Sequence, residues 1–196
     1  HSMFVIPANF SYQLTNMQGT QPARLLHVNY LPMAMQLLPD ARFLFEHPWV
    51  DESRVFGSAN SYSAARAVQG GPADFIRQSW VGNFFPDLRV WDRIDPLGDR
   101  GAGGRWVFMQ FPYSTMSAHM SVFPSRTYKK AHRHGPAIVI VIPAGEGYSI
   151  MWPEGGEKIV IPWHEGSIFV PSQRWFHQHF NVRQSMDRYL ALHPPK

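Results

Sequence analysis

Two pairs of closely spaced histidines are the residues of this chain best suited to chemistry. His132 and His134 are two positions apart, and His177 and His179 repeat this spacing further along the chain. Residues i and i+2 of a β-strand point to the same face, so each pair presents two imidazoles together. Imidazole binds Fe, Mn, Zn, Cu and Ni, so two such pairs predict a metal site without naming the metal. The alternative is that these histidines are solvated or hydrogen-bonded to neighbouring groups.

The elements that must position these histidines are predicted to be short strands. β-rich runs recur between residues 105 and 193, and turn residues such as Gly145-Glu146-Gly147 separate them. About eight short strands separated by turns are typical of an antiparallel sandwich or barrel, so the predicted fold class is all-β. The predicted strands are 105–111, 117–123, 137–142, 148–152, 158–162, 167–170, 176–180 and 188–192.

The first histidine pair resembles part of the first motif of the cupin superfamily. That motif has the form G-x5-H-x-H-x3-4-E-x6-G, and His132 to His134, followed by Gly145, matches its histidines and closing glycine. Two positions depart from the motif. Arg126 replaces the opening glycine, and Ile138 or Val139 stands where many cupins have a metal-binding glutamate.

The second histidine pair resembles the second cupin motif, G-x5-P-x-G-x2-H-x3-N. Gly166, His177 and Asn181 have the spacing of that motif, whereas Pro171 comes one residue early and the internal glycine is absent. The spacing therefore selects His177, rather than His179, as the third metal ligand.

The cupin resemblance implies both a fold and a site. The fold is the cupin double-stranded β-helix, a jelly-roll barrel. Because an aliphatic side chain cannot bind a metal, the implied site has three histidines, His132, His134 and His177, as in some cupin dioxygenases. The implied cofactor is a divalent metal ion, Fe(II) first, with Mn, Zn or Ni as alternatives. His179 would be catalytic by transferring a proton, or would supply a fourth ligand or orient the others.

Two kinds of function follow from this resemblance. The first is a non-haem, metal-dependent oxygenase of the dioxygenase type, acting with O₂ on a small organic substrate that is aromatic or carboxylated. A Mn or Zn decarboxylase, isomerase or hydrolase is a variant of it. The second is a non-catalytic small-ligand-binding or storage cupin, because a fold does not fix a function. The residues expected in the substrate pocket are His119, Tyr148, Trp152 and Trp175, and the candidate carboxylate partners are Arg126, Arg174 and Arg188.

The chain divides into three predicted regions, of which residues 105–196 form the metal-binding barrel. Residues 32–104 are predicted to be a linker or arm with short helices, because they are irregular and rich in turn residues. Residues 1–31 contain strand-like ends, and aligning Asn16 with Asn181 places Tyr12 on His177. This weak repeat predicts that residues 1–31 are the tail of a degenerate first cupin, in a fragment of a two-cupin protein resembling gentisate-type dioxygenases. The alternative is that these strands pair onto the visible barrel or a partner barrel.

Composition excludes several other classes of protein. Of 196 residues, 16% are charged and 14% aromatic, which rules out an intrinsically disordered chain. The net charge of +4 is scattered rather than clustered, so no nucleic-acid partner is expected. The longest apolar run is too short to span a bilayer and no secretory signal is visible, so we expect no membrane partner and a cytoplasmic location. We also expect a homodimer or larger homo-oligomer.

Overall fold

The computed structural model describes residues 1–6, 12–46, 62–71, 78–91, 103–112, 114–135 and 138–194. The chain forms two compact units. One comprises His1–Val5 and Ser58–Lys196, and the other comprises Ile6–Gly57. Each unit is described here by itself.

The unit of residues 6–57 contains two short helices, α1 (Leu31–Leu37) and α2 (Arg42–Phe45). Asp40 precedes α2 and its carboxylate accepts a hydrogen bond from the backbone of Arg42, while its side chain pairs with the Arg42 guanidinium. None of the described residues of this unit is buried. Residues 23–28, predicted to be strand-like, form no strand. Residues 23–28 have no neighbouring strand among the described residues of this unit with which they could pair.

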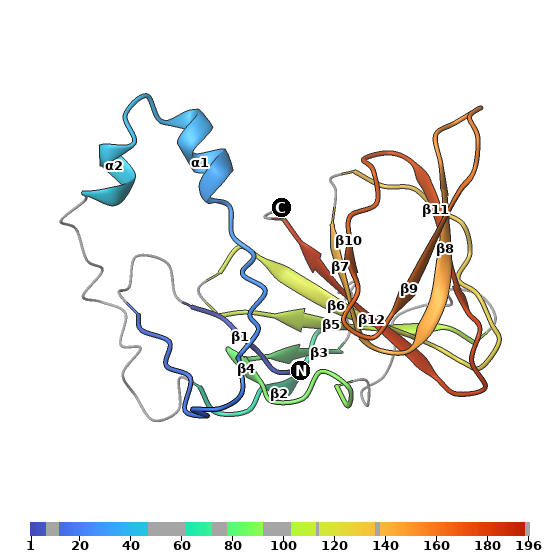
Figure 1. The fold of residues 1–196 in the computed structure, drawn as a ribbon, viewed down its shortest axis with the longest axis horizontal. Helices are drawn as coiled ribbons and strands as arrows, with labels where there is room; N and C mark the ends of the chain where they lie inside the picture. The colour runs from blue at the N-terminus through green and yellow to red at the C-terminus, as the bar shows by residue number, and fades with distance from the viewer. Residues whose placement is uncertain are drawn as a thin grey trace. The chain divides into compact units, whose positions relative to one another are not determined.

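The larger unit contains the other twelve elements, all of them strands (Figure 1). The eight strands expected between residues 105 and 193 are all present, within a few residues of their predicted ends. The strands are β1 (Met3–Phe4), β2 (Arg66–Gln69), β3 (Gln78–Val81), β4 (Phe84–Phe85), β5 (Arg105–Gln110), β6 (Ser117–Phe123), β7 (Val139–Ala144), β8 (Glu146–Trp152), β9 (Ile159–His164), β10 (Ile168–Phe169), β11 (Phe176–Asn181) and β12 (Asp187–His193).

The strand order is that of a jelly roll, which confirms the predicted fold class. One sheet has the order β10-β7-β12-β6-β5-β3-β2, and a second has the order β11-β8-β9. Residues 127–132 add a short antiparallel stretch along the free edge of β11 through bridges at Tyr128 and His132. The two sheets face each other, and the chain crosses from one to the other after β7, β9, β10 and β11 (Figure 1).

The centre of the larger sheet is buried on both faces, which explains why β6 has no exposed residue. Its inner face packs against the smaller sheet through a cluster that includes Phe123 and Tyr189, with Trp163 of β9 opposite them. Its outer face forms a second core around Met120 and Leu190. The histidines discussed below project into the space between the two sheets.

Residues 32–104, which were predicted to be a linker or arm with short helices, also contribute strands to the larger unit. β2 and β3 extend the larger sheet, and β3 pairs with β5 in parallel. β4 pairs with β1 in an antiparallel two-stranded sheet that packs beside the outer core. The N-terminal strand thus pairs within this chain, while the proposed origin of residues 1–31 in a first barrel stays a prediction. No helix among the described residues is long and apolar enough to cross a membrane.

Candidate metal centre

A β-bulge aims His132 into the barrel. Along β11, the backbone of Lys129 pairs with His179, and the backbone of His132 pairs with His177. Lys129 and His132 are three positions apart, whereas their partners His179 and His177 are two positions apart. The segment before β7 therefore contains one extra residue, which defines a β-bulge. As a result, Lys129 and His132 both point inward although they are three positions apart.

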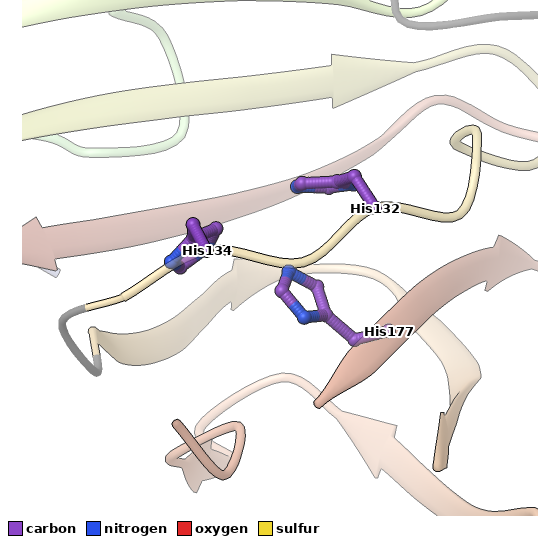
Figure 2. A group of neighbouring side chains, drawn as sticks. All are labelled: His132, His134 and His177. Atoms are coloured by element: carbon purple, nitrogen blue, oxygen red, sulfur yellow. The ribbon is translucent and has the colours of Figure 1, made fainter. Parts of the chain in front are cut away.

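Three imidazoles meet beside this bulge. The candidate ligand nitrogens of His132, His134 and His177 all lie within 4.8 Å of one another. Figure 2 shows the rings of His132 and His134, from the segment before β7, gathered with that of His177 from β11. His177 is buried, whereas the other two are half-buried, so the cluster lies at the rim of the barrel rather than in its centre.

The hydrogen bonds of these rings suit a metal ligand. His132 Nδ1 lies 2.9 Å from the carbonyl oxygen of Lys130, and His177 Nδ1 lies 3.2 Å from that of Trp175. Because a carbonyl only accepts, each Nδ1 carries the proton and each Nε2 keeps its lone pair. Partners of this kind orient metal-bound histidines in proteins. The three residues therefore fit a divalent transition-metal ion.

Among the residues that the structure describes, no carboxylate joins the three histidines. Ile138, at a position where the resemblance places a glutamate, is buried in the inner hydrophobic cluster, and Val139 begins β7. The donor set consists of three neutral imidazoles, and such a set leaves coordination positions open.

His179 lies deeper in the barrel and is held by a second set of contacts. Trp163 Nε1 donates to Ser149 Oγ at 3.0 Å, and that oxygen lies 2.7 Å from His179 Nδ1. Ser149 is fully buried and has no other acceptor among the described residues, so its hydroxyl must donate to Nδ1. The proton of neutral His179 is then on Nε2.

The pKa of His179 lies well below its ordinary value, first because of burial and then because of the neighbouring His177. Its ring is therefore neutral at ordinary pH. A neutral ring with its proton on Nε2 donates a hydrogen bond from that atom rather than binding a metal through it. This arrangement suits His179 as a hydrogen-bond donor rather than as a fourth ligand, and its expected role in proton transfer stays a prediction.

Lys129 is a functional candidate that sequence reasoning missed. Its side chain is 1% exposed, and its Nζ donates to the carbonyls of Arg105 and Val122 at 3.0 Å each. The sequence pattern did not single it out, and only the bulge reveals that it points inward. It adds a positive charge inside the barrel next to His179.

The four residues expected in the substrate pocket are not brought together. His119 lies 2.6 Å from His193, between ring nitrogens, and packs edge-on against Trp106. Tyr148 and Trp152 stack on Phe180 and Phe176, respectively. These stacked rings lie on the outer face of the smaller sheet, because His177 and His179 occupy the alternate, inward positions of β11. Tyr148 and Trp152 therefore lie on the face of β8 opposite to the one expected for residues of the substrate pocket.

Trp175 does line a cavity beside the metal centre. This open cavity has a volume of about 670 Å³, and its walls include Arg133, His134, Glu154, Gln173, Arg174 and Trp175. His134 links it to the three-histidine cluster. Of the three arginines considered as carboxylate partners, Arg174 is the one in this wall.

Four motif positions where glycine is expected have a positive φ. Gly145 and Gly166 have φ values of 126° and 85°. At two others the chain has Arg126 and Arg174, whose φ values of 53° and 63° lie in the left-handed region. A residue with a Cβ pays roughly 1–2 kcal/mol for the left-handed conformation. Both arginines therefore stand where glycine would be less strained.

Comparison with known proteins finds likeness in structure only. No protein-family model matches the chain, and no curated protein matches it in sequence. Similar solved structures include a recombinant oxalate oxidase in complex with glycolate (18% identity, 48% of this chain and 53% of that one, TM-score 0.42). Another is the oxalate decarboxylase of Lactobacillus farciminis in a formate complex (15% identity, 50% of this chain and 30% of that one, TM-score 0.45).

A third is a Cupin 2 conserved barrel domain protein of Salinispora arenicola CNS-205 (16% identity, 54% of this chain and 86% of that one, TM-score 0.43). The matched region thus spans about half of the oxalate oxidase and under a third of the oxalate decarboxylase. The chain is a jelly-roll protein with structural similarity to cupins at low sequence identity.

Proposed function

We propose that this chain is a metal-dependent oxygenase of the cupin type, which holds Fe(II) through His132, His134 and His177 and acts on a small organic substrate. The observation that supports this proposal is the convergence of three neutral imidazoles, two of them fixed through Nδ1, with no carboxylate among them. Fe(II) bound there would offer its open positions to substrate and dioxygen, and the organic substrate would supply the electrons that reduce O₂ as both oxygen atoms enter it.

The surrounding residues have separate tasks in this proposal. His179, fixed by Ser149, presents its Nε2 proton to a ligand bound in the barrel. The inner cluster around Phe123 and Tyr189 excludes water from the far side of the site. Lys129 contributes a fixed positive charge that favours an anionic ligand near His179.

Metal analysis tests the site itself. Protein produced with iron and purified without oxygen is expected to contain about one metal ion per chain, measured by plasma mass spectrometry. His132→Ala and His177→Ala are expected to lose that metal, because each removes one of three ligands. His164→Ala is the matched control, since His164 is exposed on β9 outside the cluster. Metal content that is unchanged in both ligand variants would refute the site.

Oxygen uptake tests the reaction. The metal-loaded protein is expected to consume O₂ with at least one member of a panel of phenolic acids and 1,3-diketones. His179→Leu is expected to keep its metal and lose most of this uptake, because leucine has no hydrogen-bond donor to replace Nε2. The absence of a carboxylate ligand also favours a second candidate, a non-catalytic binding or storage protein. A metal-loaded protein inert to the whole panel would support that candidate or a non-oxidative Mn or Zn enzyme.

A further inference from the structure

The cavity beside His134 carries one positive charge that no described residue neutralises. Arg133 and Glu154 pair across the cavity, with Nη1 and Oε2 2.6 Å apart. The Arg133 guanidinium also lies over the ring of Phe176, 4.7 Å from its centroid. The charge of Arg133 is therefore already balanced by Glu154. The guanidinium of Arg174, by contrast, makes no hydrogen bond or ion pair with any described residue.

The backbone of Arg174 is unfavourable for an arginine. Its φ of 63° lies in the left-handed region, where glycine is preferred. Its side chain is exposed. Its backbone N–H donates to the carbonyl of His134 at 3.1 Å, which ties it to a residue of the metal centre. An arginine in strained backbone, whose guanidinium has no partner among the described residues and stands in the wall of a cavity, points to a role in ligand binding.

The charge of the metal centre points to the same kind of ligand. Three neutral imidazoles leave the full charge of a divalent cation unbalanced, and buried Lys129 adds another positive charge in the barrel. Glu154 is the one acidic residue in the cavity wall, and Arg133 already pairs with it. A negatively charged ligand balances this excess, whereas a neutral one does not.

We propose that Arg174 selects a small organic carboxylate as the ligand of this cavity. The guanidinium of Arg174 binds the carboxylate, the side-chain amide of Gln173 donates a further hydrogen bond, and the ring of Trp175 packs against the organic part. This inference rests on the proposed function for the part of the charge that the metal supplies. Arg174 is a specificity-determining residue in it.

Binding of simple probes tests this inference without any need for turnover. Benzoate, acetate and succinate are titrated into the full chain by isothermal calorimetry, with and without added Zn(II), and metal content is measured in the same samples. Benzamide serves as the uncharged analogue of benzoate. At least one carboxylate is expected to bind, and benzamide is expected to bind at least tenfold more weakly than benzoate. Equal binding of benzoate and benzamide overturns the proposal, as does the absence of binding by all three carboxylates.

Variants separate Arg174 from general charge effects. Arg174→Gln and Arg174→Gly are expected to weaken carboxylate binding at least tenfold. The glycine variant relieves the backbone strain, so loss of binding there is not a failure to fold. Arg126→Gln is the matched control, because Arg126 is also exposed and has a φ of 53°, but is not in the cavity wall. It is expected to bind like the unmodified protein.

The outcomes distinguish the two proposals. Arg174-dependent binding in protein that takes up no metal supports the inference and refutes the metal site. Wild-type binding by Arg174→Gln in metal-loaded protein refutes the inference and leaves the metal site standing. Sodium sulfate is added as a competing arm. If it displaces benzoate at equal concentration, the cavity is a general anion site and the assignment to carboxylates fails.

Discussion

The carboxylate of Asp187 lies fully buried at the start of β12, where it packs against Gly145. Neither of its oxygens meets the full geometry of a hydrogen bond with a described residue, although the backbone N–H of Glu146 lies near them. Burial raises the pKa of Asp187 from 3.8 to about 6, although the backbone of Glu146 and the nearby Arg183 and Arg188 favour its charged form. A buried carboxylate with so little hydrogen bonding is a cost to stability, and here that cost depends on pH.

Asp187→Asn is expected to stabilise the protein above pH 6. Below about pH 4 the carboxyl is protonated in both the folded and the unfolded chain. Between pH 4 and 6 the unfolded chain releases this proton first, so the folded state loses stability as pH rises, by on the order of 2–3 kcal/mol. The variant lacks this loss. Urea unfolding of both proteins from pH 4 to 8 measures the difference.

A control of opposite sign accompanies this experiment. Arg89 hydrogen-bonds to Asp87 and lowers the pKa of that exposed carboxyl to about 2. Asp87→Asn is therefore expected to lose a little stability at neutral pH rather than to gain it. If unmodified protein is more stable than Asp187→Asn at pH 7.5, the account of Asp187 is wrong.

At the scale of elements, the positions of the barrel strands along the chain could be predicted, but the bulge could not. Hydrophobic runs separated by glycine and proline turns marked all eight strands of the barrel, because each strand buries at least one face. A period of two correctly paired His132 with His134 and His177 with His179. It could not show that Lys129 shares a face with His132, because an extra residue in one strand leaves no mark in composition.

The same limit explains the errors about the aromatic residues. Tyr148 and Trp152 were expected inside because aromatic side chains fill cores, yet they stack on the outer face of the smaller sheet. Which face of a strand is inward depends on its register with the neighbouring strand. Once the inward face of β11 is fixed by His177 and His179, its pairing with β8 places Tyr148 opposite Phe180, outside.

Deletions in the segment before β7 test the bulge. Removing Ala131 leaves His132 two positions after Lys129, so regular pairing still sets it opposite His177, and metal binding is expected to persist. Removing both Lys130 and Ala131 places His132 on the outward face, and metal binding is expected to be lost. Metal content of the two purified variants measures this. Loss of metal in both, with folding shown intact by circular dichroism, would contradict the bulge.

At the scale of the whole molecule, the two sheets of the jelly roll each end in an exposed strand. β9 is an edge of the smaller sheet, and β10 is an edge of the larger one. Both edges carry apolar side chains that are about half exposed: Ile159, Val160, Ile168 and Val170. Unpaired strand edges with exposed apolar side chains are prone to join another chain.

These edges lead us to expect a homodimer in solution. Light scattering coupled to size-exclusion chromatography is expected to give twice the chain mass of 22.5 kDa at tens of micromolar. The double variant Val160→Lys, Ile168→Lys is expected to be monomeric, because charge on a strand edge opposes pairing.

Val182→Lys is the matched control, since Val182 is exposed to a similar extent but follows β11, away from both edges. It is expected to remain dimeric, and all three proteins should bind the same amount of metal because none of these residues contacts the histidine cluster. A wild-type protein of monomer mass at this concentration, or a double variant that stays dimeric, would show that these edges do not join two copies.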